Sequence, residues 1–190
     1  MPANDVRELV AWGRANPGAL NYASFGVGTS SHLFAELLAR QSGVPMTHVP
    51  YKGAGDAAKD LLSGRVQLMF DSASSALPNA RTGRVRVLGA VADRRAPLLP
   101  DVPTLAEQGF RDIDLTGWLG WFGPANLPPD VVATLNAALA RVLASPDVKE
   151  AFARGAYEAV GSSPEALAER TREDHARWGR IVRDLGYAPQ

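Results

Sequence analysis

Apolar residues in the first half of the chain alternate between helical spacing and short runs bounded by turn residues. Residues 6–15 show the helical pattern, and Asp5 stands where an N-cap belongs. A second helix is expected to begin within residues 25–32 and to end at Gly43, a typical C-cap glycine. The remaining elements follow from the same patterns: helices at 56–63 and 72–82, and strands at 20–24, 46–49, 66–70 and 85–91. This alternation predicts an α/β fold whose parallel or mixed sheet is covered on both faces.

The pattern changes after a Pro- and Arg-rich connector at residues 94–103. Residues 115–122 read as a strand, and three amphipathic helices are expected to follow near 132–143, 148–154 and from 162 onward. Ser162 and Glu165 have the spacing of a capping box, with Pro164 in the first turn. One strand is not enough for the helices to pack on. Either it joins the first sheet or its own sheet is missing.

Composition excludes several classes of protein. The 190 residues are 46% hydrophobic and 21% charged, with a net charge of zero, so bulk charge attracts neither nucleic acid nor an anionic membrane. Cysteine is absent, which excludes disulfides and thiolate chemistry. The three histidines show no metal-ligand spacing. No run of 18 apolar residues occurs, and residues 1–5 lack the features of a secretory signal.

The segment after the first strand is the best candidate for chemistry. Gly26 and Gly28 allow a close turn, and the hydroxyl residues Thr29, Ser30 and Ser31 open the next helix. Unpaired N–H groups and the helix dipole make such a terminus an anion site that suits a carboxylate. The alternative is plain N-capping by Thr29 or Ser30, which needs no ligand.

Other polar residues near strand ends have competing interpretations. His32 is expected to be neutral near a helix N-terminus, and either orients the loop or is structural. Asp71 either meets a ligand amine or, as we favour, caps the helix that follows it. Lys52 either supplies a counter-charge or lies in solvent, and Tyr51 either lines a cleft or packs structurally. A hydrolase triad of Ser30 or Ser31 with His32 and Asp71 is disfavoured, because helix neighbours diverge.

Several blocks of the chain together resemble one family. They are Asn21-Tyr22-Ala23-Ser24, Gly28-Thr29-Ser30-Ser31-His32-Leu33, His48-Val49-Pro50-Tyr51-Lys52-Gly53, Gln67-Leu68-Met69-Phe70-Asp71, residues 99–107, and Trp121-Phe122-Gly123-Pro124-Ala125. Their content and order resemble the Bug-type periplasmic receptors of tripartite tricarboxylate transporters. The resemblance implies a two-lobed, type II periplasmic-binding-protein-like fold. Residues 1–115 would form one complete lobe, the second, and residues 116–190 the C-terminal part of the first. Typical members carry a signal peptide and further first-lobe sequence ahead of this region, so the chain is expected to be truncated.

The resemblance implies a receptor that captures a small carboxylate in the periplasm and delivers it to membrane transporter subunits. It implies no enzyme activity, cofactor, metal or nucleic acid. The ligand-binding residues that it implies, together with the candidates above, are Ser24, Gly26, Gly28, Thr29, Ser30, Ser31, His32, Tyr51, Lys52 and Asp71. The main alternative is a truncated interaction or structural remnant that associates with another chain, including a homodimer through the C-terminal helices. A hydrolase is the third.

Overall fold

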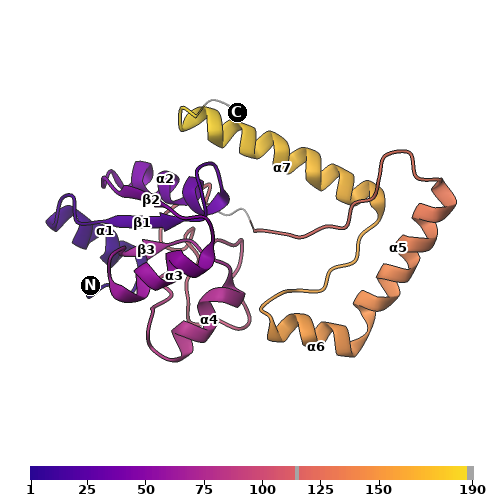
Figure 1. Cartoon of the computed structure of the whole chain (residues 1–190), viewed down its shortest axis with the longest axis horizontal. Helices are drawn as coiled ribbons and strands as arrows, with labels where there is room; N and C mark the ends of the chain where they lie inside the picture. Colours follow the sequence, from indigo (N-terminus) through magenta and orange to yellow (C-terminus); the bar gives the residue numbers. More distant parts are fainter. Residues whose placement is uncertain (114–115, 188–190) are drawn as a thin grey trace. The chain divides into compact units, whose positions relative to one another are not determined.

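The computed structural model describes residues 1–113 and 116–187 and divides into two compact units, Met1–Thr116 and Gly117–Gln190 (Figure 1). The assignment of these units to two receptor lobes stays a prediction. In residues 1–113 and 116–187, no single helix has the length and apolar composition of a membrane span. Helices α5 (Pro129–Ala144) and α6 (Pro146–Arg154) have that length and composition only when taken together, and a bend of 71° separates them.

The first unit is built on a three-stranded parallel sheet, as the alternation of elements predicted. Its strands are β1 (Asn21–Ser24), β2 (Thr47–Pro50) and β3 (Leu68–Met69), in the order β2-β1-β3. Four helices alternate with them: α1 (Val6–Ala15), α2 (Ser30–Ser42), α3 (Ala54–Ser63) and α4 (Ala73–Arg81).

Local signals place most of these boundaries. Asp5 caps α1 by accepting the N–H of Glu8 at 2.7 Å. Gly43 ends α2 and Gly64 ends α3, with φ values of 64° and 78° in the left-handed region that favours glycine. The predicted helices at 6–15, 56–63 and 72–82 are confirmed to within two residues.

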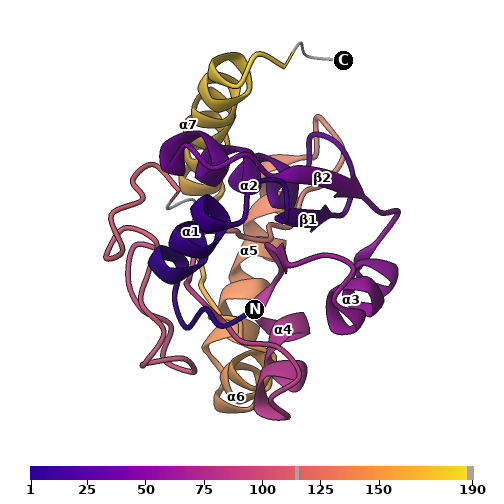
Figure 2. The same ribbon diagram turned by 90° about the vertical axis from the view of Figure 1, so that its left-hand side faces the viewer.

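The two faces of the sheet carry different layers. On one face, Ala23 of β1 packs with Ala57 of α3 and with Val66, and all three are buried. Neighbouring strand residues point to opposite faces. Tyr22 accordingly faces the other way, where its hydroxyl donates to Glu36 of α2. Figures 1 and 2 show α2 and α3 on opposite sides of the strands. The sheet is therefore covered on both faces, as predicted.

Two predicted strands are wrong. Residues 85–91 form no strand, and only Ala90 makes an isolated parallel bridge, to Thr104. Residues 116–122 are also irregular, and Leu115 lies outside the described residues. Strand propensity yields a strand only where a neighbouring strand pairs with it. In the region 85–91, a hydrogen bond from the Gln108 side chain to the Leu88 carbonyl replaces part of the pairing that a neighbouring strand would provide.

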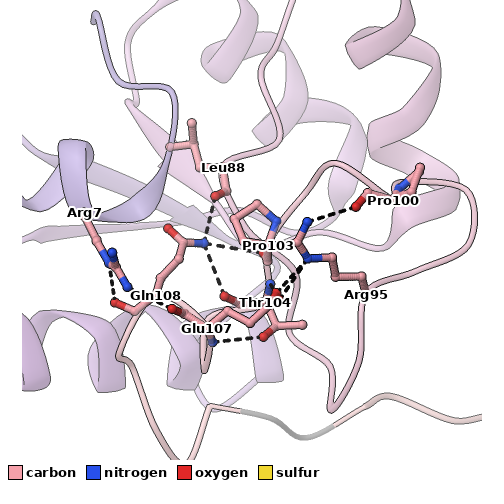
Figure 3. Close-up of polar contacts among 8 residues, drawn as sticks. All are labelled: Arg7, Leu88, Arg95, Pro100, Pro103, Thr104, Glu107 and Gln108. Atoms are coloured by element: carbon pink, nitrogen blue, oxygen red, sulfur yellow. Dashed lines mark hydrogen bonds and ion pairs between the residues drawn. The ribbon is translucent and has the colours of Figure 1, made fainter.

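Gln108 makes this bond at the centre of the first unit, where it is 6% exposed (Figure 3). Its Oε1 accepts the buried N–H of Val6 at 2.7 Å. Its Nε2 donates to the carbonyl of Leu88 at 3.1 Å and lies 3.4 Å from the carbonyls of Pro103 and Thr104. One amide thus joins the start of α1 to two segments about 80 to 100 residues further along.

The turn that carries Gln108 is fixed by a reciprocal pair of bonds. Glu107 accepts the Thr104 N–H at 2.7 Å, and Thr104 Oγ1 accepts the Glu107 N–H at 3.1 Å (Figure 3). This is a capping box. Arg95 contacts the same carboxylate at 2.9 Å and holds the pKa of Glu107 below its usual value. Part of the family-like block at 99–107 therefore has a structural role.

Residues 117–187 of the second unit form three helices, α5, α6 and α7 (Pro164–Asp184). Ser163 caps α7 by accepting the Ala166 N–H, so the predicted cap at Ser162 is one residue early. Trp118 Nε1 donates to Asp174 of α7. No residue of α5 or α6 is buried. Large apolar side chains of this unit are exposed: Leu119 at 86%, Trp121 at 79%, Phe122 at 70%, Leu135 at 52% and Val142 at 53%.

Candidate functional site

The sheet topology selects one edge for ligand binding. The strands are parallel, so β1, β2 and β3 all end at the same edge. From the central β1 the chain crosses to β2 on one side, and the next crossover places β3 on the other side. The strand order therefore reverses at β1, and such a switch point, at the carboxyl ends of the strands, is where open α/β sheets usually bind ligands. The loop between β1 and α2 lies there.

Two glycines shape this loop. Gly26 has φ 132° and Gly28 has φ 80°, both in a region that side chains with a Cβ rarely adopt. Thr29 follows in an extended conformation and occupies the N-cap position of α2, but its side chain makes no capping bond. The loop therefore turns back on itself before the helix starts.

Most hydroxyl groups of the loop are used within it. Thr29 Oγ1 donates to the Gly26 carbonyl at 2.7 Å and lies 2.9 Å from Ser31 Oγ. Ser31 Oγ accepts the Phe25 N–H at 3.1 Å. Simple capping of α2 by Thr29 or Ser30, the alternative from the sequence, is thus not what these hydroxyls do. They brace the turn.

Several donors remain unused. Among the residues that the structure describes, the N–H groups of Val27, Ser30 and Ser31 have no acceptor, and neither does the Ser30 hydroxyl. Val27 is 63% exposed and Ser30 is exposed, whereas Ser31 is 3% exposed. The positive end of the α2 dipole adds to their attraction for an anion. The arrangement suits a carboxylate.

A group of buried and half-buried polar side chains lies behind the loop, between β1, β2 and α2. Ser24 Oγ is 2.6 Å from His48 Nε2 and 3.2 Å from both the N–H and the carbonyl of Gly26. His32 Nδ1 accepts the Gly28 N–H at 3.2 Å. The imidazole rings of His32 and His48 are 4.2 Å apart. Tyr22 stacks on His48 at 4.8 Å.

Both imidazoles favour the neutral form. Burial lowers the pKa of His32 below 6.5, and the nearby Glu36 carboxylate opposes that shift. Burial also lowers the pKa of His48; the neighbouring His32 adds to this, and Glu36 again opposes it. Neutrality of His32 agrees with its expectation from the sequence. Its hydrogen bond to Gly28 supports the orienting role over a purely structural one.

The other predicted residues follow the neighbouring strands at the same edge. Tyr51 donates to Asp60 at 2.7 Å, a bond that raises its pKa, so its hydroxyl is engaged within the unit. Lys52 is exposed. Asp71 accepts the adjacent Ser72 N–H at 2.8 Å. Ser72 caps α4, so the expected capping role of Asp71 is wrong.

Sequence reasoning missed three residues of this polar group. His48 was weighed only as a metal ligand, and Tyr22 and Glu36 were not singled out. Tyr22 and His48 are direct partners in the sheet register, which requires the strand pairing to be known. The spacing of His32 and Glu36, one helical turn apart, was the available signal. In the part of the chain that the structure describes, no three His, Asp or Glu residues are arranged to hold a metal ion.

Comparison with known proteins identifies the family. The model described as tripartite tricarboxylate transporter family receptor matches residues 1–187. The chain belongs to this family. A relative from Pseudomonas sp. (strain P51), the UPF0065 protein in the tcbD-tcbE intergenic region, is 41% identical over 179 residues. That alignment covers 94% of this chain and 53% of the relative, so the chain spans about half the length of this relative.

Solved structures confirm the periplasmic-binding-protein fold. The periplasmic binding protein BugD superimposes with a TM-score of 0.87 at 30% identity, over 100% of this chain and 64% of BugD. The R. palustris protein Rpa4515 with adipate gives a TM-score of 0.91 at 30% identity, over 100% of this chain and 64% of that structure. The resemblance to Bug-type receptors is thus confirmed. Members of this receptor family share an α/β, type II binding-protein architecture.

Proposed function

We propose that this chain captures a small carboxylate at the loop between β1 and α2 and serves a tripartite tricarboxylate-type transporter. The observation that carries the proposal is the set of unused donors on Val27, Ser30 and Ser31 at the switch point of the sheet. Charge-assisted hydrogen bonds of this kind contribute roughly 1.5–3 kcal/mol each. The adipate-bound structural relative supports the same ligand class.

Within this proposal the predicted site residues have different roles. The ligand meets backbone and hydroxyl donors of residues 26–31, while Ser24 and His32 hold the loop from behind. Lys52 and Asp71, at the ends of the flanking strands, bias the choice of ligand by their charge. Members of the family bind their ligands in the periplasm and deliver them to membrane transporter subunits. We extend this location and these partners to the present chain.

Replacing Gly28 with alanine should weaken adipate binding about tenfold or more. A Cβ in the left-handed region costs about 1–2 kcal/mol, so the loop relaxes and its donors diverge. Gly18→Ala is the matched control, because Gly18 has nearly the same φ, 79° against 80°, and neither Cβ would meet an atom within 4 Å. Isothermal titration calorimetry with adipate compares them. Equal affinities in the two variants, or no adipate binding by the unaltered chain, would contradict the proposal.

Binding without covalent chemistry is part of the same proposal. Ser31 Oγ is engaged with Phe25 and Thr29, His32 Nδ1 with Gly28, and Asp71 with Ser72. In these bonds the three side chains contact other groups rather than one another, so they do not form a nucleophile–base relay. Ser24 does contact His48, but Ser24 is 0% exposed and out of reach of a substrate.

A second candidate function is self-association through the C-terminal helices. It is favoured by the lack of any buried residue in α5 and α6 and by the exposure of Leu135 and Val142, two turns apart on one face. Contiguous exposed apolar surface usually marks an interface. Leu135→Glu should abolish a dimer seen by light scattering, whereas Ala133→Glu, on the opposite face, should not. A monomer at all concentrations would exclude this candidate.

A further inference from the structure

The imidazoles of His32, which is buried, and of His48, which is half-buried, hold the two glycines that shape the loop. His32 Nδ1 accepts the Gly28 N–H directly, at 3.2 Å. His48 acts through Ser24, whose hydroxyl is 2.6 Å from His48 Nε2 and 3.2 Å from both backbone groups of Gly26. The rings themselves are in contact, with centroids 4.2 Å apart. Each glycine is thus tied to one member of a single histidine pair.

Protonation affects the two histidines differently. A neutral imidazole has one donor and one acceptor nitrogen, whereas the cation has two donors. His48 can donate to Ser24 Oγ in either state. His32 can hold the Gly28 N–H only while Nδ1 is unprotonated, because two donors cannot share a hydrogen bond. A proton on His32 Nδ1 therefore breaks the tie to Gly28.

Among the residues that the structure describes, one carboxylate, that of Glu36, acts on both histidines. Glu36 of α2 lies 4.0 Å from His32 Nε2 and accepts from Tyr22 of β1. At the Tyr22 register, β3 contributes the apolar Leu68. Helix α3 packs on the opposite face of the sheet, and its charged residues are engaged there: Asp56 with Lys59, and Asp60 with Tyr51 and Arg65.

We propose that His32 and His48 are positioning residues for the carboxylate loop, and that the loop holds its ligand while His32 is neutral and releases it when His32 takes up a proton. The inference rests on the proposed function, because it concerns the same loop. Added positive charge alone would strengthen anion binding. A loss of affinity on acidification therefore distinguishes the geometric effect from simple electrostatics. Because burial lowers the pKa of His32 below its usual 6.5, the ligand is held at neutral pH and released only as the pH falls through that lowered pKa.

Two substitutions of His32 separate the effect of its hydrogen-bond acceptor from the effect of its protonation. In His32→Asn the side-chain oxygen can occupy the position of Nδ1 and accept the Gly28 N–H, but it does not titrate. His32→Leu removes the acceptor at every pH. His175→Asn, at an exposed position of α7, controls for loss of a histidine elsewhere. Adipate affinity is measured for all four proteins from pH 7.5 to pH 4.5, with circular dichroism to check folding.

Unaltered protein and His175→Asn should lose affinity about five- to tenfold more than His32→Asn as the pH falls, as expected for one lost hydrogen bond. Comparison with His32→Asn cancels the protonation of adipate itself. His32→Leu should bind about five- to tenfold more weakly than His32→Asn at pH 7.5. Identical pH profiles for the unaltered protein and His32→Asn, or stronger binding at low pH, would overturn the proposal.

A ligand-free measurement keeps the two proposals distinguishable. In nitrogen-15 NMR spectra of the unaltered chain, the Gly28 amide resonance should shift with the same midpoint as the His32 ring nitrogens, and His32 should carry its neutral-state proton on Nε2. Failure to bind adipate together with such a coupled titration would refute the proposed ligand and support the role of His32. A Gly28 resonance that ignores the His32 titration would refute that role whatever the chain binds.

Discussion

Replacing Gln108 with leucine should lower the free energy of unfolding of the first unit by about 2–4 kcal/mol. Leucine has a similar volume, so the main loss is polar. The N–H of Val6, buried at the start of α1, loses its acceptor, and the carbonyl of Leu88 loses a donor. An unsatisfied buried donor costs about 1–3 kcal/mol, and the lost bonds add to it. Because Gln108 joins segments far apart in sequence, the loss should affect the whole unit.

Gln41→Leu is the control for the Gln108 variant. Gln41 is exposed and makes one bond, from Nε2 to the carbonyl of Arg111 at 2.6 Å, so its loss should cost less than about 1 kcal/mol. Native-state hydrogen exchange of the β1 amides reports the first unit alone and avoids assuming that both units unfold together. Equal protection of β1 in the two variants would show that the Gln108 amide does not clamp the unit.

Helices with local start and stop signals could be predicted from the sequence. The helix at 6–15 was predicted at its observed bounds, because Asp5 caps it and its apolar face has regular spacing. Gly43 ended its helix as expected, and Gly64 ends α3 in the same way, since the left-handed conformation is a property of single residues.

Strands depend on partners that the local sequence does not name. Residues 85–91 have strand-like composition, yet the Gln108 side chain and one bridge at Ala90 replace a ladder. β3 is limited to Leu68–Met69, shorter than the predicted 66–70. Residues 116–122 pair with no strand among the described residues.

The candidate site shows the same division. Gly26, Gly28 and the hydroxyls after them were recognisable, because a loop and the helix that it opens are neighbours in sequence. The pairing of His48 with Ser24 and its stacking on Tyr22 depend on strand register and remained hidden. The internal use of the Thr29 and Ser31 hydroxyls was also hidden, since it arises only when the loop turns back on itself.

Gly13→Ala should destabilise the first unit by about 1 kcal/mol, the balance of an overpacking cost and a smaller gain in helix propensity. In an open helix this change stabilises by up to about 1 kcal/mol. At Gly13 the new Cβ would lie 2.5 Å from Leu20 Cδ1 and 2.8 Å from Val44 Cγ1. Leu20 is 1% exposed and Val44 is 2% exposed, so neither side chain can swing aside into solvent. Overpacking of this kind costs about 1–3 kcal/mol and outweighs the gain in propensity.

Gly55→Ala provides the opposite sign within the same unit. Gly55 lies in the first turn of α3, where an added Cβ meets nothing within 4 Å, so alanine should stabilise by about 0.5–1 kcal/mol. Hydrogen exchange of the β1 amides should therefore become faster in Gly13→Ala and slower in Gly55→Ala. The contrast isolates packing from propensity, because both glycines are helical and both changes add one methyl group. Slower exchange in both variants would mean that α1 can move away from Leu20 and Val44 at little cost in free energy. The close approach of this helix to the core would then not be required for the stability of the unit.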